Sequence, residues 1–377
     1  MPEVPVAPLV SARPEISAMV GYHSPQVPCS VRLNTNESPF APPAAWQEAL
    51  ADEIASTDFR RYPDRSAVAL RTALAAHHGV LPDQVFAANG SNEVLQTICL
   101  AYGGAGRTAL VFEPTYAMHR QISRTTGAAI ADGPRRSDLT IDPAQAVAAI
   151  SEHRPSIVFL CSPNNPTGLV EGREVIEAVL AAAPGIVVVD EAYGQFADWS
   201  ALELMDEHSA LCVVRTYSKT WAMAGARLGY LLAPAWMNAE LDKVVLPYHL
   251  DSMKQAAGRL ALRYETDMRA RVVELVRQRG RILNGLAELP VTVWPSQANF
   301  VLFRPDHSSA DAVWHELVAR DVLIRNCSSW PRLDNCLRVS VGSEPENDAF
   351  LAALEAALQS VQSVPSVQAP RETAVAR

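Results

Sequence analysis

Short apolar runs alternate with helical segments over roughly residues 45–250, and this alternation limits the fold more than any other feature. The runs are rich in β-branched residues, as expected of strands that are covered on both faces. Strands are expected at 84–89, 108–112, 156–161, 186–190, 211–216 and 228–233. Helices are expected between them at 92–101, 116–126, 143–153 and 172–183. The pattern predicts an α/β domain built around a largely parallel sheet.

The pattern changes after Pro290, where a second, α+β domain is expected. Short strands are expected at 291–296, 298–305, 322–326 and 336–342, with helices at 309–320 and 345–360, after a long amphipathic helix, continuous or broken once, from about 252 past 281. We therefore expect a large domain over 45–250 and a small domain formed by 1–44 and 251–360. The remaining residues, 361–377, read as a loose tail because they are rich in Pro, Ser, Ala and charge.

Charge and cysteine content exclude several classes of function. The net charge of -9 argues against a nucleic acid as the main partner. No run of 18 apolar residues predicts a membrane span, and the first residues, MPEVPVAPLVSARPE, lack the basic start and apolar core of a signal peptide. The six cysteines show no C-x-x-C spacing, so they indicate neither a metal site nor a disulfide framework. Reduced thiols in a cytoplasmic protein are expected instead.

Polar and aromatic residues follow the first three predicted strands of the large domain. Such sheets bind ligands at the carboxyl ends of their strands. Gly90, Ser91 and Asn92 open a helix whose backbone N–H groups and hydroxyl can hold an anion; a plain helix cap is the alternative. Tyr116 places a ring at the same edge. Asn165 lies in the segment SPNNPTG, whose two prolines stiffen the loop that aims this side chain.

Two further strand ends supply charged groups. Asp190 ends a buried strand three residues before Tyr193, and a carboxylate at that depth needs a cationic partner unless it caps a helix. Lys219 follows Ser218 among small and aromatic residues, and Arg227 lies eight positions further on. Burial would lower the pKa of the Lys219 amine and let it form a Schiff base with a carbonyl. A surface lysine is the alternative interpretation.

One ligand, pyridoxal 5′-phosphate, uses all of these groups. Its aldehyde needs a lysine, its pyridinium nitrogen needs a carboxylate, and its phosphate needs helix N–H groups, hydroxyls and an arginine. Asn165 and Tyr193 can donate to its phenolate oxygen, and Tyr116 can face its ring. No single group is specific for this cofactor, but the ordered set of groups predicts it.

Several segments resemble the signature segments of fold-type I aminotransferases of class II. They are SPNNPTG (162–168), DEAY (190–193) and SK followed by RLG (218–229). Four more resemble histidinol-phosphate aminotransferases in particular: LNTNESPF (33–40), RYPD (61–64), NGSNE (89–93) and LRVSVG (337–342). The resemblance covers roughly residues 20–360. It implies a large domain with a mostly parallel seven-stranded sheet and a smaller α+β domain.

The resemblance also implies roles for the residues around the cofactor. Lys219 would hold pyridoxal phosphate as an internal aldimine, and Asp190 would keep the ring nitrogen protonated. Asn165 and Tyr193 would bind the phenolate oxygen. The residues implied at the phosphate are Gly90, Ser91, Asn92, Ser218 and Arg227. Tyr62 would reach into the active site of the neighbouring subunit, which implies a homodimer with shared sites.

On the substrate side, the resemblance implies Arg338 for the anionic group, Arg325 as a second arginine, and Tyr22 and Asn36 nearby. An arginine inside an apolar strand needs an anion or an acid, so a buried ion pair is the alternative for Arg338. A surface position is the alternative for Arg325. His249 stands where many histidinol-phosphate enzymes carry asparagine; it lines the substrate pocket or lies on the solvent side of a connector.

The implied activity is a ping-pong transamination in histidine biosynthesis. An amino donor, histidinol phosphate, and a 2-oxo acid acceptor, 2-oxoglutarate, would alternate at one site. An aromatic amino acid aminotransferase would share every cofactor residue, and a threonine-phosphate decarboxylase would share the scaffold. A cofactor-binding sensor without turnover is a third alternative, which the acidic charge and the lack of a helix-turn-helix segment disfavour.

Overall fold

The computed structural model describes residues 10–21 and 27–362. Tyr22, which the family resemblance implies on the substrate side, lies outside the described residues, as do residues 363–377 of the expected tail. None of the helices in the described ranges combines the length and the hydrophobicity that crossing a membrane requires.

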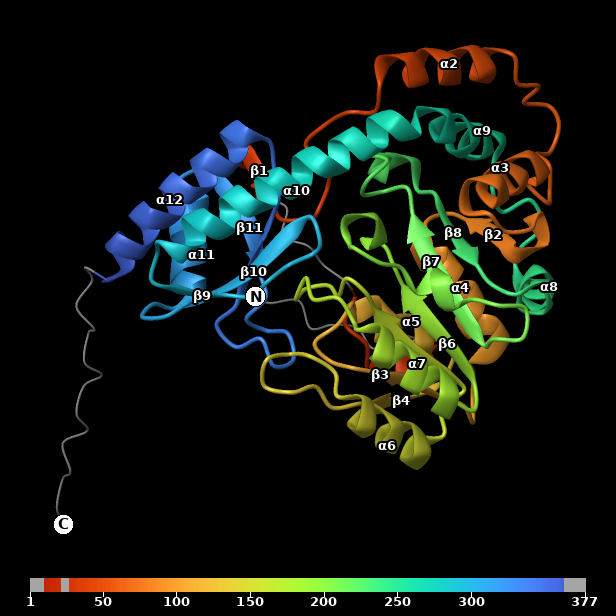
Figure 1. Cartoon of the computed structure of the whole chain (residues 1–377), viewed down its shortest axis with the longest axis horizontal. Coiled ribbons are helices and arrows are strands. Elements are labelled where there is room, and N and C mark those ends of the chain that lie inside the picture. Colours follow the sequence, from red (N-terminus) through yellow and green to blue (C-terminus); the bar gives the residue numbers. More distant parts are fainter. Residues whose placement is uncertain (1–9, 22–26, 363–377) are drawn as a thin grey trace.

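Seven strands form the large sheet, in the order β2-β8-β7-β6-β5-β3-β4 (Figure 1). Their bounds are β2 (Val85–Ala88), β3 (Thr108–Val111), β4 (Ala129–Asp132), β5 (Ile157–Cys161), β6 (Ile186–Asp190), β7 (Leu211–Thr216) and β8 (Gly229–Leu232). All neighbours are parallel except β8, which is antiparallel to both β2 and β7. The mostly parallel sheet predicted from the apolar runs is thereby confirmed, and every residue of β5, β6 and β7 is buried.

Helices cover both faces of the large sheet. The helices around it are α2 (Ala44–Ala55), α3 (Val68–His78), α4 (Ser91–Tyr102), α5 (Ala117–Thr125), α6 (Pro143–His153), α7 (Arg173–Ala182), α8 (Ala235–Val244) and α9 (Ser252–Ala261). Of these, α2 packs against α9 at the outside of the molecule (Figure 1). Apolar residues of α4 and α8 pack with one side of β5 to β7, and those of α6 and α7 pack with the other. This double cover explains why the central strands are apolar at nearly every position.

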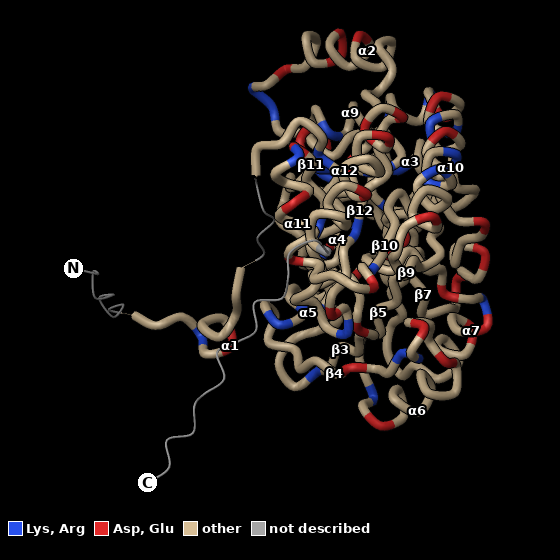
Figure 2. The backbone as a smooth tube through the Cα atoms, turned by 90° about the vertical axis from the view of Figure 1, so that its left-hand side faces the viewer, with Lys and Arg blue, Asp and Glu red and all other residues tan. Residues whose placement is uncertain are grey.

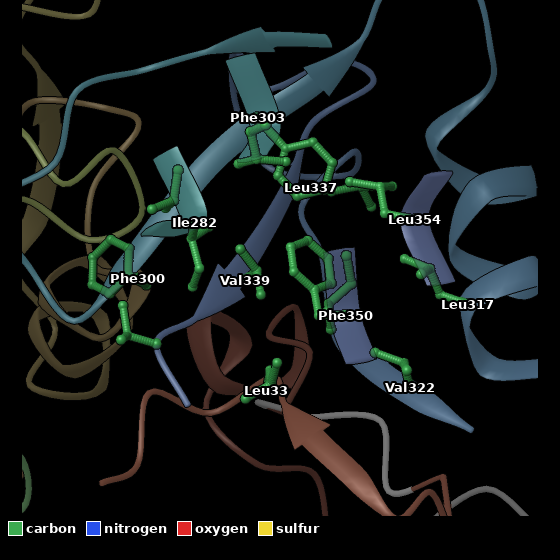
Figure 3. Packing of buried hydrophobic residues seen from close by; sticks show 14 of the residues in the cluster. Leu33, Ile282, Phe300, Phe303, Leu317, Val322, Leu337, Val339, Phe350 and Leu354 are labelled. Carbon is green, nitrogen blue, oxygen red and sulfur yellow. The ribbon is translucent and has the colours of Figure 1, made fainter. Parts of the chain in front are cut away.

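The second sheet has five strands in the order β1-β11-β12-β10-β9. Their bounds are β1 (Val31–Leu33), β9 (Val291–Val293), β10 (Phe300–Pro305), β11 (Val322–Asn326) and β12 (Leu337–Ser340). Only β1 is parallel to its neighbour: it pairs with β11, from the other end of the chain. Residues of this sheet pack with α10 (Glu265–Ala287), α11 (Ala310–Ala319) and α12 (Glu344–Gln362). Figure 3 shows Leu33, Val339 and Phe350 meeting in that core.

The long helix expected from residue 252 is interrupted. A short 3₁₀ segment, Leu262–Tyr264, separates α9 from α10, which then runs toward the small sheet (Figure 1). Figure 2 shows basic and acidic residues interspersed along α10. Some of them form exposed ion pairs, such as Arg281 with Asp348 of α12. The four-residue helix α1 (Pro14–Ser17) lies against α5, where Arg13 donates to the carbonyl of Thr125 at 2.6 Å.

Candidate active site

A cavity of about 370 Å³ lies between the carboxyl edge of the large sheet and one face of the small sheet. Its walls include most of the residues singled out in the sequence: Asn36, Ser91, Asn92, Tyr116, Asn165, Asp190, Tyr193, Ser218, Lys219, Arg227 and Arg338. Gly90 adjoins the wall, whereas Arg325 and Tyr62 do not line it. The residues of the large sheet meet here because the carboxyl ends of parallel strands lie at the same edge, as predicted.

Lys219 differs from the two other lysines of the chain. Lys243 and Lys254 form ion pairs with acidic residues three positions earlier, Glu240 and Asp251. The Lys219 amine instead donates to two backbone carbonyls of the loop after β1, that of Asn36 at 2.8 Å and that of Thr35 at 3.3 Å. The surface interpretation of Lys219 is therefore wrong, since its amine faces the cavity.

Burial is also the main reason that the pKa of Lys219 is lowered to about 8. The positive charges of Arg338 and Arg227 lower this pKa further, and the carboxylate of Glu37 partly opposes them. With a pKa of about 8, about a tenth of the amine is uncharged at neutral pH, far more than in an ordinary lysine. The amine can therefore act as a nucleophile or take up a proton, as the sequence predicted.

Asp190, the last residue of β6, contacts a buried histidine that no sequence motif indicated. Nε2 of the fully buried His119 lies 3.0 Å from Oδ2 of Asp190. A carboxylate can only accept, so this nitrogen carries the proton. The His119 ring stacks on Phe159 at 4.9 Å between centroids. Tyr116, one helical turn earlier, donates to Oδ1 of Asn92 at 3.0 Å and lines the cavity.

One end of the cavity is built to hold an anion. Helix α4 starts at Ser91, directly after Gly90, which has a φ of +83°. A Cβ atom at Gly90 would lie 2.8 Å from Nη2 of Arg227, so only glycine allows the guanidinium this close to the helix start. Ser218 lines the same cavity and accepts a hydrogen bond from Thr216 at 3.0 Å. The helix dipole, the hydroxyls and the arginine together favour a phosphate-sized anion.

The middle of the cavity presents polar groups from both sheets. Oδ1 of Asn165 accepts from Nη1 of Arg338 at 2.5 Å, which leaves the amide nitrogen of Asn165 as a donor. The hydroxyl of Tyr193 accepts from Nδ2 of Asn36 at 2.9 Å. Burial raises the pKa of Tyr193, so its phenol keeps its proton and remains a donor. These two side chains can therefore bind one oxygen atom of a ligand.

The other end of the cavity carries the arginines of the small sheet. Arg338 on β12 stands opposite Arg325 on β11, and both residues are buried. Arg338 donates to the carbonyl of Asn34 at 3.0 Å, and its Nε has no hydrogen-bond partner within the part of the chain that the structure describes. The ring of Trp330 lies over both guanidinium groups, with its centroid 5.5 Å from Cζ of Arg325 and 6.0 Å from that of Arg338. The surface interpretation of Arg325 is thus wrong.

Besides Arg325, two of the singled-out residues do not line the cavity. The Tyr62 side chain is 79% exposed and stacks on Tyr248, with ring centroids 4.5 Å apart. His249 does not line the main cavity: its Nε2 lies 2.9 Å from the carbonyl oxygen of Ala87, and its ring stacks on Phe86. Within this chain, neither residue meets a ligand held between the two sheets.

A lysine, an acid and an anion-binding helix start at one sheet edge, opposed by an arginine-bearing second sheet, define a fold-type I transferase. The chain belongs to the aminotransferase class I and II family, whose model matches residues 30–354. Its sequence is 45% identical to the histidinol-phosphate aminotransferase of Frankia casuarinae over 91% of this chain and 89% of that one. The Corynebacterium diphtheriae enzyme of the same name is 44% identical, with 92% and 96% covered.

Solved structures agree with these sequence relatives. The histidinol-phosphate aminotransferase of Sinorhizobium meliloti, in complex with pyridoxal 5′-phosphate, superposes with a TM-score of 0.83 at 25% identity, over 92% of this chain and 97% of that one. An aspartate aminotransferase of Thermotoga maritima shares the fold at a TM-score of 0.78 and 20% identity, with 87% and 92% covered. The predicted family, fold class and aminotransferase activity are thereby confirmed.

Proposed function

We propose that this chain is a pyridoxal-phosphate-dependent aminotransferase that uses histidinol phosphate as amino donor and 2-oxoglutarate as acceptor. The observation that carries the proposal is that Lys219, Asp190, Arg227 and Arg338 line a single cavity. Lys219, Asp190 and Arg227 match the groups that the cofactor needs. Arg338 matches the anionic group of a substrate. The choice of substrate is supported by relatives of that name at 43–46% identity over nine-tenths of the chain or more.

The residues of the cavity fit pyridoxal phosphate. The close approach of Arg227 to Gly90 and the start of α4 offer a seat for its phosphate. Asp190 and Lys219 line the same cavity. The cavity volume of about 370 Å³ is in the range of small-molecule sites, and the orphaned Nε of Arg338 still needs a partner.

When bound, the cofactor supplies an aldehyde that condenses with amines and a ring that draws electrons away from the substrate Cα. Asp190 would hold a proton on the ring nitrogen, and His119 would keep that carboxylate oriented. Asn165 and Tyr193 would bind the phenolate oxygen through an amide N–H and a phenol O–H. The Lys219 amine would act as the general base that takes the proton from the substrate Cα. Its pKa of about 8 suits this role, because an amine with such a pKa can both accept and release a proton near neutral pH.

Arg338 would receive both substrates in turn. A phosphate ester and an α-carboxylate are both anions, and a fixed guanidinium fork can bind either one through charge-assisted hydrogen bonds. Phe300 supports this guanidinium from the small-sheet core, with its ring centroid 5.1 Å from Cζ of Arg338. The shared end of the cavity thus allows two chemically different substrates to alternate.

We also propose a homodimer in which Tyr62 completes the site of the neighbouring subunit. In one chain Tyr62 stacks with Tyr248 on the surface, and the nearby sequence exposes Phe59 at 66% and Leu246 at 74%. Large apolar side chains exposed together favour burial against a partner. We also propose that the chain divides into a large domain, 45–250, and a small domain formed by 1–44 and 251–360. A cytoplasmic location is proposed as well, and the six free cysteines support it.

A donor panel tests the substrate assignment. The purified enzyme, loaded with pyridoxal phosphate, is supplied with 2-oxoglutarate and with histidinol phosphate, phenylalanine or phosphothreonine, and glutamate is measured. The proposal expects the highest kcat/KM with histidinol phosphate. A higher value with phenylalanine would make the chain an aromatic amino acid aminotransferase. Release of carbon dioxide from phosphothreonine, without glutamate, would instead identify a decarboxylase.

A further inference from the structure

A buried pair of opposite charges lies next to Asp190, and the proposed reaction gives it no role. Glu191 directly follows Asp190, and Arg215 belongs to β7. Nη2 and Nε of Arg215 donate to the same carboxylate oxygen of Glu191, Oε2, at 2.6 Å and 3.1 Å. Both side chains are buried, and neither residue lines the cavity. Any effect of the pair on a ligand must therefore pass through the residues that it holds in place.

The carboxylate of Glu191 is bound on both of its oxygens. Oε1 accepts from the backbone N–H of Ala201 at 2.6 Å, and Oε2 accepts from the hydroxyl of Ser200 at 2.8 Å in addition to Arg215. Arg215 also donates to the Ser200 hydroxyl at 2.8 Å and to the hydroxyl of Tyr230 on β8. The pair thus ties the end of β6 to β7, to β8 and to the segment that begins at Ser200.

The turn that carries Asp190 and Tyr193 wraps around the Glu191 side chain. Gly194 N–H donates to the Glu191 carbonyl at 2.9 Å, which closes the turn. A Cβ atom at Gly194 would lie 2.9 Å from both Cβ and Oε2 of Glu191, so only glycine lets the turn pack this closely on the carboxylate. Asp190 and Tyr193 line the cavity from this same turn. The place of the Glu191 carboxylate therefore affects both side chains.

The turn is held from both faces of the large sheet. Side chains alternate between the faces of a strand, so Asp190 and Glu191 point to opposite sides. On one side, His119 of α5 bonds to Asp190. On the other side, Arg215 lies two residues after Val213, which packs with apolar residues of α6 and α7. His119 and Arg215 therefore restrain the same turn from opposite directions.

Stability alone does not account for a buried pair of this kind. Two buried charges are costly to desolvate, and apolar residues of similar volume in their place are often at least as stable. We propose that Glu191, held by Arg215, is a positioning residue that sets where Asp190 and Tyr193 lie in the cavity. The inference rests on the proposed function, in which these two side chains bind the ring nitrogen and the phenolate oxygen of the cofactor. Loss of the pair displaces both contacts together and leaves Arg338 in place.

Replacing both charges separates positioning from stability. Glu191→Leu and Arg215→Met each leave one buried charge unpaired, so each should lower the Tm of the enzyme in saturating pyridoxal phosphate. The double variant should recover most of that Tm, because no unpaired charge remains. Its kcat should stay about tenfold below the wild type, with KM for both substrates changed by less than about twofold, because only the preorganised groups at the cofactor are displaced. A double variant that regains both Tm and kcat would overturn the proposal.

The absorbance of the cofactor-loaded enzyme gives a readout that needs no substrate. A donor to the phenolate oxygen stabilises the state in which the bound cofactor has lost a proton. A displaced Tyr193 should therefore move the pH midpoint of the absorbance change upward by about half a unit. Arg215→Lys provides a second variant, because it keeps the buried charges balanced but cannot reproduce all the hydrogen bonds of the guanidinium. An unshifted midpoint in Arg215→Lys and in the double variant would refute the role of Glu191.

A second buried ion pair of the same domain offers the matched control. Nη2 of Arg135 lies 2.8 Å from Oε1 of Glu171, and Arg135 also donates to the carbonyls of Phe112 and Leu139. None of these residues lines the cavity. The double variant Arg135→Met with Glu171→Leu should keep the wild-type kcat and midpoint, and an equal shift there would overturn the specific role of Glu191. Because the titration uses no amino donor, a wild type that prefers phenylalanine would refute the proposed donor alone.

Discussion

The two walls of the cavity differ in how the chain builds them. On the large-sheet wall, Asp190 ends β6 and Lys219 follows β7, and every residue of these two strands is buried, so both side chains are fixed by a rigid backbone. The small-sheet wall comes from segments far apart in sequence: the loop after β1, the strand bearing Arg338, and the loop bearing Trp330. In the proposed function the first wall carries the groups for bond making and the second carries the groups for substrate choice, so variants of the two walls should fail in different ways.

The largest effect is expected at Lys219. Lys219→Ala should lower kcat by more than about a thousandfold, because the covalent and the proton-transfer roles are lost together. Glutamate formation from histidinol phosphate measures this, and thermal unfolding should show that the fold persists. Lys254→Ala is the matched control: that lysine pairs with Asp251 outside the cavity, and the variant should keep wild-type activity. Near-normal turnover in Lys219→Ala would show that the large-sheet wall does not carry the catalytic groups.

Asp190→Asn should follow with a loss in kcat of about a hundred- to a thousandfold, since a preorganised charge at the ring nitrogen is removed. KM should change little, because this wall does not contact the anionic group of the substrate. Asp138→Asn serves as the control, since Asp138 is exposed and bonds only within its own turn, to Thr140. A rise in KM without a fall in kcat would contradict the division between the walls.

Arg338→Gln tests the small-sheet wall and should lower kcat/KM by about a hundredfold for both substrates, as expected for a lost charge-assisted interaction. Steady-state kinetics with histidinol phosphate and with 2-oxoglutarate measure the two values separately. Arg304→Gln provides a control within the same sheet, because Arg304 stacks on Trp294 away from the cavity. A loss confined to one substrate would show that the two anions do not share this arginine.

Mixing two variants of low activity tests whether Tyr62 of one subunit completes the active site of the other. If Tyr62 acts across the interface, Tyr62→Ala mixed with Lys219→Ala should give hybrid dimers with one complete site, restoring about a quarter of the sites. If Tyr62 acts within its own chain, mixing should restore nothing beyond the residual activity of Tyr62→Ala. Size-exclusion chromatography before mixing establishes the oligomeric state.

The smallest expected effect is a shift in the pKa of Lys219, on the large-sheet wall, when the charge of Arg338 on the small-sheet wall is removed. In cofactor-free protein the Lys219 amine should be protonated below pH 8 and reactive above it, since its pKa is lowered to about 8. The rate of covalent trapping by pyridoxal phosphate and borohydride should therefore rise with pH through that value. The Arg338 charge contributes to the lowering, so Arg338→Gln should move the midpoint upward. An unchanged midpoint would mean that the small-sheet wall does not influence the lysine.

The contrast between the walls also explains what could be predicted from the sequence. Strands β6 and β7 were predicted with their observed bounds, because strands covered on both faces leave an unbroken apolar run. Strand β4 was missed, since it lies at the sheet edge with only one of its four residues buried. The apolar run also marks where each buried strand ends, and this is why the site residues at those strand ends could be predicted.

Residues outside that logic were harder to find. His119 sits beneath Asp190 in the fold, but in the sequence it is one histidine on an ordinary helix; its spacing of three from Tyr116 was the available signal. Trp330 follows no strand end of the large sheet, and its position depends on the pairing of β11 with β12. The loop around Asn36 reaches the cavity only because β1 joins the distant β11. Strand β1 has only three residues and pairs with a distant strand, so the sequence around it shows no pattern that predicts the pairing.

The pairing of β1 with β11 has a consequence for synthesis on the ribosome. Val31 emerges early but aligns with Val322, so the first strand must wait for nearly the whole polypeptide before it finds its place. Until then the carbonyls of Thr35 and Asn36 cannot dock against the amine of Lys219. A chain released prematurely therefore lacks a finished catalytic chamber, however well its central layer has folded, and truncated products remain inert.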